Sequence, residues 1–168
     1  MTSVSSLGRA VDAMHVTAAT PNGQVTGEVT GWYAVRVAFA PGYADRVGEE
    51  ELGLQVQRLA RLLFAARMAA YDRIVEEHLP QPVLPVTDQD RAYDDDVASL
   101  ESTGTSADGS VRIRGVAMTR WVVRIRPGLV DGVGGERVAQ LVTEPANAFV
   151  RDRVAGVRRL KNLHYAGR

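Results

Sequence analysis

The chain has 168 residues, and its 20 basic and 20 acidic side chains give a formal net charge of zero. It contains no cysteine, which excludes disulfides and thiolate chemistry. No apolar run approaches the roughly 18 residues that a membrane-spanning helix needs, and residues 1–6 lack the charged-then-apolar order of a signal peptide. We therefore expect a cytoplasmic protein of one domain or two small ones, without a membrane span.

The first half, residues 1–79, is predicted to contain a short leading amphipathic segment, three strands and one long helix. Turn residues and period-two alternation of apolar residues predict strands over 16–19, 25–30 and 33–40. From Glu49 the apolar residues recur at steps of three and four, which predicts a helix to about His78.

Residues 80–107 are predicted to be an exposed linker. The stretch begins with three prolines, continues with five aspartates and ends in Ser and Thr. Because no core-forming period is present, this linker could be either ordered or disordered.

The second half, residues 108–168, repeats the plan with a turn at Asp108-Gly109, a hairpin over 111–126 and a helix from Gly135. Pro145 interrupts the helical pattern, and proline inside a helix costs about 3 kcal/mol. We therefore expect a kink or break at Glu144 that divides the helix into two pieces.

The two halves are related by an internal repeat at an offset of 86 residues. Of the 57 residue pairs formed between 22–78 and 108–164, 15 are identical, whereas composition alone gives roughly 4 or 5. The repeat predicts an α+β fold in which each half is an antiparallel hairpin or three-stranded sheet followed by a long helix. The halves are expected to share one core as an intramolecular pseudo-dimer, with Trp32 and Trp121 near the sheet–helix or half–half contact.

Five arginines of the second hairpin are the candidate site for an anion or a partner: Arg112, Arg114, Arg120, Arg124 and Arg126. They alternate with Val and Ile, so their guanidinium groups should share one face of two neighbouring strands. Their first-half equivalents are Thr26, Glu28, Ala34, Ala38 and Ala40. The charge is accordingly uneven, with −6 for residues 1–100 and +6 for residues 101–168. The arginines either meet an anionic partner, meet the acidic linker of the same chain, or form a solvated face.

The order of these elements resembles the YbaB/EbfC family of small bacterial proteins. The resemblance is carried by the stretches 32–42 and 121–128, each of which ends in Pro-Gly, and by the helical stretches 52–74 and 134–142. The stretch Ala65 to Tyr71 is most similar to an actinobacterial branch of the family, several members of which are encoded with type VII (ESX) secretion systems. The resemblance implies dimer-forming α–β–α units and either nucleoid-associated DNA binding or a secretion-associated role.

The sequence indicates no catalytic, metal or cofactor site. His15, His78 and His164 lack metal-ligand spacing, and the latter two are better interpreted as charges at helix ends. The acidic run 94–96 lacks a fixed frame for a cation, the glycines at 132–135 lack a phosphate loop's Lys, and no nucleophile motif is present. We expect a non-enzymatic interaction protein whose partner is a secretion substrate or component. A nucleoid-type DNA binder is the alternative, and a homodimer is the alternative to the pseudo-dimer.

Overall fold

The computed structural model describes residues 2–32, 34–79 and 87–166 and has the α+β class that the sequence predicts. Tyr33, placed in the third predicted strand, and residues 80–86 of the predicted linker lie outside the described residues. The first half contains α1 (Thr2–Asp12), β1 (His15–Ala19), β2 (Val25–Thr30), β3 (Ala34–Phe39) and α2 (Tyr43–His78). The rest contains α3 (Asp88–Ser99), β4 (Glu101–Thr105), β5 (Val111–Val116), β6 (Arg120–Ile125), α4 (Leu129–Val133) and α5 (Gly135–Tyr165).

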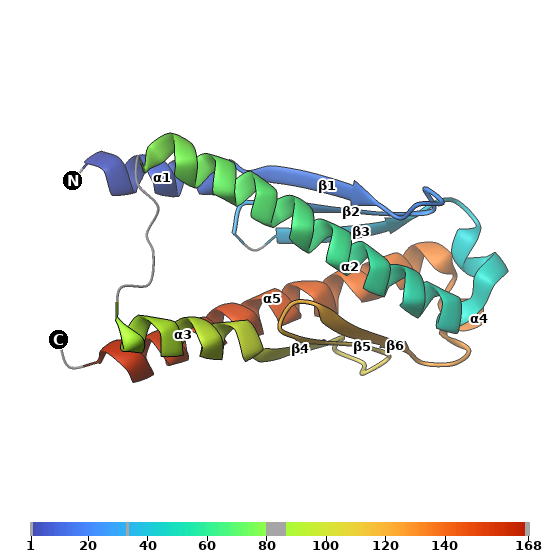
Figure 1. The fold of residues 1–168 in the computed structure, drawn as a ribbon. Coiled ribbons are helices and arrows are strands. Elements are labelled where there is room, and N and C mark those ends of the chain that lie inside the picture. Colours follow the sequence, from blue (N-terminus) through green and yellow to red (C-terminus); the bar gives the residue numbers. More distant parts are fainter. Residues whose placement is uncertain (1, 33, 80–86, 167–168) are drawn as a thin grey trace.

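The strands form two three-stranded antiparallel sheets, in the orders β1-β2-β3 and β4-β5-β6. One face of each sheet is buried, as the period-two pattern predicts, and the other face is exposed. In Figure 1 the first sheet lies in the upper half of the molecule and the second in the lower half, while α2 and α5 cross at the centre.

Each long helix contacts both sheets. Helix α2 packs on β1 and β2 of the first sheet and also on β6 of the second, whereas α5 packs on β4 and β5 and also on β3. The helix predicted from Glu49 corresponds to the part of α2 that follows Gly48, whose φ of 77° interrupts the helical backbone. Glycine tolerates this left-handed φ without steric cost, so the chain turns there before the long helix begins.

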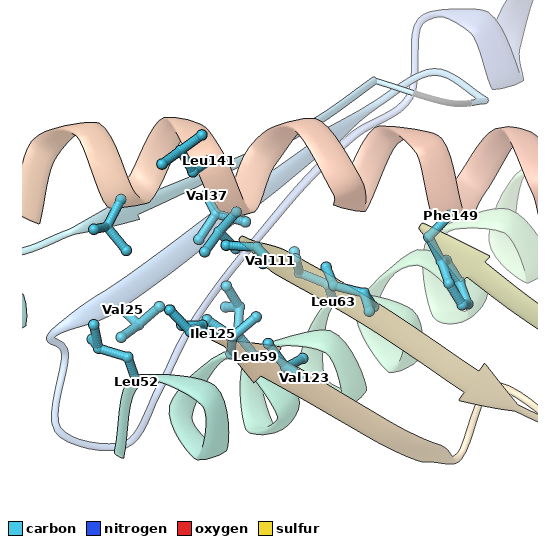
Figure 2. Close-up of a cluster of buried hydrophobic side chains, with 14 of the residues drawn as sticks. Val25, Val37, Leu52, Leu59, Leu63, Val111, Val123, Ile125, Leu141 and Phe149 are labelled. Atoms are coloured by element: carbon cyan, nitrogen blue, oxygen red, sulfur yellow. The ribbon is translucent and has the colours of Figure 1, made fainter. Parts of the chain in front are cut away.

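The core is built from side chains of both sheets and both long helices. Figure 2 shows Val25 and Val37 of the first sheet together with Ile125 of the second, with Leu59 of α2 beside them. Trp121 packs on Phe149 of α5 with ring centroids 4.7 Å apart, which is the predicted sheet–helix contact. Trp32 meets Tyr71 of α2 at 6.4 Å but keeps 37% of its surface exposed.

The prediction for residues 80–107 missed two elements. Residues 88–99 form α3, and residues 101–105 form β4, an edge strand of the second sheet. None of the residues of α3 is buried, which explains why no apolar period marks it. The start of α3 is nevertheless marked in the sequence, because Thr87 and Asp90 form a reciprocal capping box at its N-terminus.

The predicted division of the last helix is wrong, because α5 runs from Gly135 to Tyr165 as one helix with Pro145 inside it. Pro145 is fully buried, and the adjoining part of α5 lies so close to β4 that a Cβ on Gly104 would overlap the Pro145 carbonyl oxygen. Packing of α5 along β4 and β5 therefore outweighs the local cost of the proline.

Candidate partner-binding surface

The five candidate arginines lie on and beside the exposed face of the second sheet. Arg112 and Arg114 alternate with buried residues of β5, Arg120 and Arg124 occupy the same face of β6, and Arg126 directly follows β6. All five are exposed. We call this set the Arg face.

At the centre of the Arg face two guanidinium-bearing residues are directly opposed. Arg112 and Arg124 are Cα partners in the β5–β6 register, and the bond from Arg126 N–H to the Ser110 carbonyl (2.8 Å) places Arg112 and Arg124 at a hydrogen-bonded position of the ladder. Neither takes part in the ion pairs found among the described residues. Like charges opposite each other destabilise a hairpin, so the centre of the face favours an added anion.

Arg114 already has a carboxylate. Its Nε and Nη2 both donate to Glu101 of β4, at 2.7 Å each, in a fork-like pair. This pair lowers the pKa of Glu101 and raises that of Arg114. Glu101 belongs to the predicted linker, so the linker does supply one acidic contact to the Arg face. Sequence reasoning missed this residue because it missed β4.

The remaining acidic residues of the predicted linker lie elsewhere. Helix α3 packs against the C-terminal end of α5, where Asp96 meets His164 Nε2 at 2.7 Å and Asp90 accepts a bond from the Tyr165 hydroxyl at 2.6 Å. Asp90 raises the pKa of Tyr165 to about 12. Arg153 of α5 donates to the Val97 carbonyl of α3 at 2.9 Å, which adds a further polar contact between the two helices.

The exposed face of the first sheet is different in charge. Glu28 of β2 accepts from His15 at 3.1 Å and pairs with Arg36 at 3.6 Å. Ala34, Ala38 and Ala40 stand where the second half has arginines. The concentration of positive charge is thus a property of the second sheet.

A groove of about 700 Å³ runs beside the Arg face, between β6 and the first turns of α2. Arg112, Arg124 and Arg126 line one side of it, and Glu49, Glu50 and Leu54 line the other. Gln57 lies between the two walls, where its Oε1 accepts a bond from the Val123 N–H of β6 at 2.9 Å. This groove could not be predicted from the sequence, because its second wall comes from a helix of the other half.

Among the described residues, no group of three or more His, Cys, Asp or Glu side chains could hold a metal ion. At the C-terminal end of α2, His78 Nδ1 donates to the Ile74 carbonyl at 2.8 Å. His164, near the end of α5, instead contacts the Asp96 carboxylate through its Nε2. Within the same described ranges, no helix has the length and apolarity that a membrane crossing requires.

Comparisons of the chain with protein-family models, with curated proteins and with solved structures gave no match.

Proposed function

We propose that the chain is a non-enzymatic adaptor of the YbaB-like class that binds a protein partner through the Arg face. The observation that carries the proposal is the opposed pair Arg112 and Arg124, which forms no ion pair with any described residue, whereas neighbouring Arg114 pairs with Glu101. A partner that brings carboxylates to this pair removes the repulsion and forms charge-assisted hydrogen bonds.

The association with type VII secretion rests on the sequence resemblance of the stretch Ala65 to Tyr71. A secretion substrate or component is accordingly the proposed partner. The neutral net charge and the acidic surface of α3 favour a protein over a polyanion as the general ligand.

We also propose that the fold is a duplicated unit arranged as an intramolecular pseudo-dimer. Two hydrogen bonds support this proposal, from Val123 N–H to Gln57 Oε1 and from Val37 N–H to Thr143 Oγ1. The residues of the two bonds correspond at the offset of 86. The glycines that precede α2 and α4, Gly42 and Gly128, also correspond and share a left-handed backbone.

DNA binding is the second candidate function, because exposed arginines on one sheet face can contact phosphates. In that case log affinity falls with log salt concentration, and the slope shrinks by roughly 0.9 for each phosphate contact removed. An acidic protein partner gives a shallower salt dependence, since screening acts over about 10 Å at 0.1 M salt.

The test is capture from a native lysate with the wild type and with Arg112→Ser/Arg120→Ser/Arg124→Ser. The triple variant should lose a specific protein that the wild type captures. It should keep its stability, because exposed substitutions cost within about 0.5 kcal/mol each. The matched control is Arg151→Ser/Arg158→Ser/Arg159→Ser, which removes three exposed arginines from α5 and should retain the partner.

Titration of fluorescent duplex DNA at two salt concentrations separates the two candidates. Recovery of nothing but nucleic acid, together with a salt slope that shrinks in the Arg112/Arg120/Arg124 variant, would reverse the ranking. Capture of the same proteins by both triple variants would contradict a role of the Arg face.

A further inference from the structure

The groove beside β6 has one positive wall and one mixed wall. Arg124 and Arg126 lie two residues apart on the exposed side of the chain, and Arg112 lies opposite Arg124. Since alternate residues of a strand share a face, the three guanidinium groups border one stretch of the groove.

On the α2 wall, one of the two carboxylates is already engaged. Glu49 accepts a hydrogen bond from Val130 N–H at 3.0 Å, and this contact lowers the pKa of Glu49. Glu50 is left facing the groove as a hydrogen-bond acceptor. Leu54, one turn further along α2, is 45% exposed and adds an apolar contact.

The edge of β6 presents backbone groups to the same space. Arg126 bonds inward to Ser110, so by the alternation of an antiparallel ladder the N–H and C=O of Ile125 point away from β5. Ile125 lines the groove, and Gln57 occupies the next outward position, at Val123. An extended chain in the groove can therefore bond to the main chain at Ile125.

We propose that this groove binds an extended acidic segment of the partner protein. The carboxylates of the segment form ion pairs with Arg112, Arg124 and Arg126. Its backbone forms hydrogen bonds with the main chain of Ile125 and the side chain of Glu50, and an apolar side chain packs on Leu54. The inference rests on the proposed function in that it takes the ligand to be a protein, and it adds where the segment lies and what its chemistry is.

A peptide fits this groove better than a nucleic acid does. A peptide backbone supplies N–H donors for Glu50 and both donor and acceptor for Ile125, whereas a phosphodiester backbone offers acceptors that Glu50 repels. The exposed Leu54 has an apolar partner in a peptide side chain but none in a phosphate backbone.

The molecule contains a comparison groove, of about 1150 Å³, between β3 and the start of α5. Ala38 and Ala40 line it at the positions of Arg124 and Arg126. Gln140 stands there at the position of Leu54. Of positive side chains this second groove has that of Arg36, which pairs with Glu28 at 3.6 Å. It lacks the counterparts of Arg124, Arg126 and Leu54, so it should not take an acidic segment.

The probe is a library of random 12-residue peptides displayed on phage and selected on the full chain. The variant Arg112→Ser/Arg124→Ser/Arg126→Ser, which we call the groove variant, serves as the target for counter-selection. A selected peptide is then synthesised with a fluorescent label and titrated into the wild type, into this triple variant, into Leu54→Ser and into the α5 control Arg151→Ser/Arg158→Ser/Arg159→Ser. Fluorescent duplex DNA is titrated in parallel.

Selected peptides should be acidic and carry at least one large apolar residue. The groove variant should weaken binding about tenfold or more, because charge-assisted hydrogen bonds are lost. Leu54→Ser should weaken it about threefold through lost apolar contact, and the α5 control should leave it unchanged.

Three results of the peptide experiments overturn the inference: no selected peptide, neutral or basic peptides, or equal binding to the wild type and the groove variant. The DNA titration supplies a fourth such result. If duplex DNA binds to the wild type and to the α5 control but not to the groove variant, the groove is assigned to nucleic acid. If the peptide experiments fail while a lysate protein still depends on Arg112, Arg120 and Arg124, the proposed function stands and the groove inference falls.

Discussion

At the scale of single residues, the close approach of α5 to β4 depends on Gly104. A Cβ at this position would overlap the Pro145 carbonyl oxygen and lie 2.5 Å from Phe149 N. We predict that Gly104→Ala destabilises the fold by about 1–3 kcal/mol or more, as overpacking does. Gly8→Ala is the control, because a Cβ on Gly8 of α1 has nothing within 4 Å and should stabilise α1 by about 0.5–1 kcal/mol. Guanidinium denaturation of both variants measures the difference, and equal midpoints would contradict the tight approach.

Asp108 should give the fold a measurable acid sensitivity. The Ser110 hydroxyl (2.6 Å), the Ser110 N–H (3.0 Å) and the Ser106 hydroxyl (2.9 Å) all donate to its Oδ1. These bonds lower its pKa from 3.8 to about 2. Since the folded pKa lies below the unfolded one, the stabilisation is present above pH 3.8 and is lost as the pH falls toward 2.

Asp108→Asn tests this pH dependence, because Asn22 serves the equivalent turn by accepting from Gln24 N–H at 3.1 Å. The variant should be less stable than the wild type at pH 7, and the gap should close between pH 4 and pH 2 in urea titrations. A carbon-detected NMR titration of the Asp108 carboxyl should show a midpoint of about 2. A gap that stays constant with pH would contradict this assignment.

At the scale of elements, side chains of α5 complete the hydrogen bonding of the β3 edge. Asn147 accepts from Val35 N–H at 3.0 Å and donates to its carbonyl at 2.8 Å. We predict that Asn147→Leu costs about 1–3 kcal/mol, because both backbone groups lose their partner. Hydrogen exchange should accelerate at the Val35 amide. Gln140→Leu, an exposed change on the same helix, should alter neither quantity. Unchanged Val35 protection in Asn147→Leu would show that the edge does not depend on α5.

The elements that the sequence predicted are those that bury one face. The period of two in β3 and β6 and the steps of three and four in α2 arise because a sheet or helix face must enter the core. Helix α3 is held by polar contacts with His164 and Tyr165, so no apolar period marks it. The predicted division of the last helix at Glu144 was wrong because the free-energy cost of Pro145 is local, whereas the packing that outweighs this cost comes from β4.

The same distinction applies to the candidate site. The exposure of the Arg face was predictable, since alternation in a strand decides which side chains leave the core. The Glu101 contact and the groove were not, because each needs a tertiary neighbour: β4 for Arg114, and α2 for the wall that faces Arg124.

At the scale of the whole molecule, each half depends on the other's helix. Gly53 of α2 lies so near β6 that a Cβ there would be 3.0 Å from the Val123 carbonyl, and Thr143 of α5 bonds to both backbone groups of Val37. A half on its own would expose the apolar surface that these contacts cover. The stability of the molecule therefore resides in contacts between segments far apart in the chain.

We predict that two fragments, residues 1–84 and 85–168, form a 1:1 complex when they are expressed together. The contacts of α2 with β6 and of α5 with β3 do not require a covalent connection, so mixing should restore the far-ultraviolet dichroism and thermal transition of the intact chain. That transition should depend on concentration, as association requires.

Analytical ultracentrifugation of the two fragments, alone and mixed, decides between three cases. A 1:1 complex supports the mutual dependence, and a homodimer of fragment 1–84 alone would add support for duplication, because Gln57 would then meet β3 as it now meets β6. Two folded fragments that remain monomeric after mixing would show that each half is an independent domain.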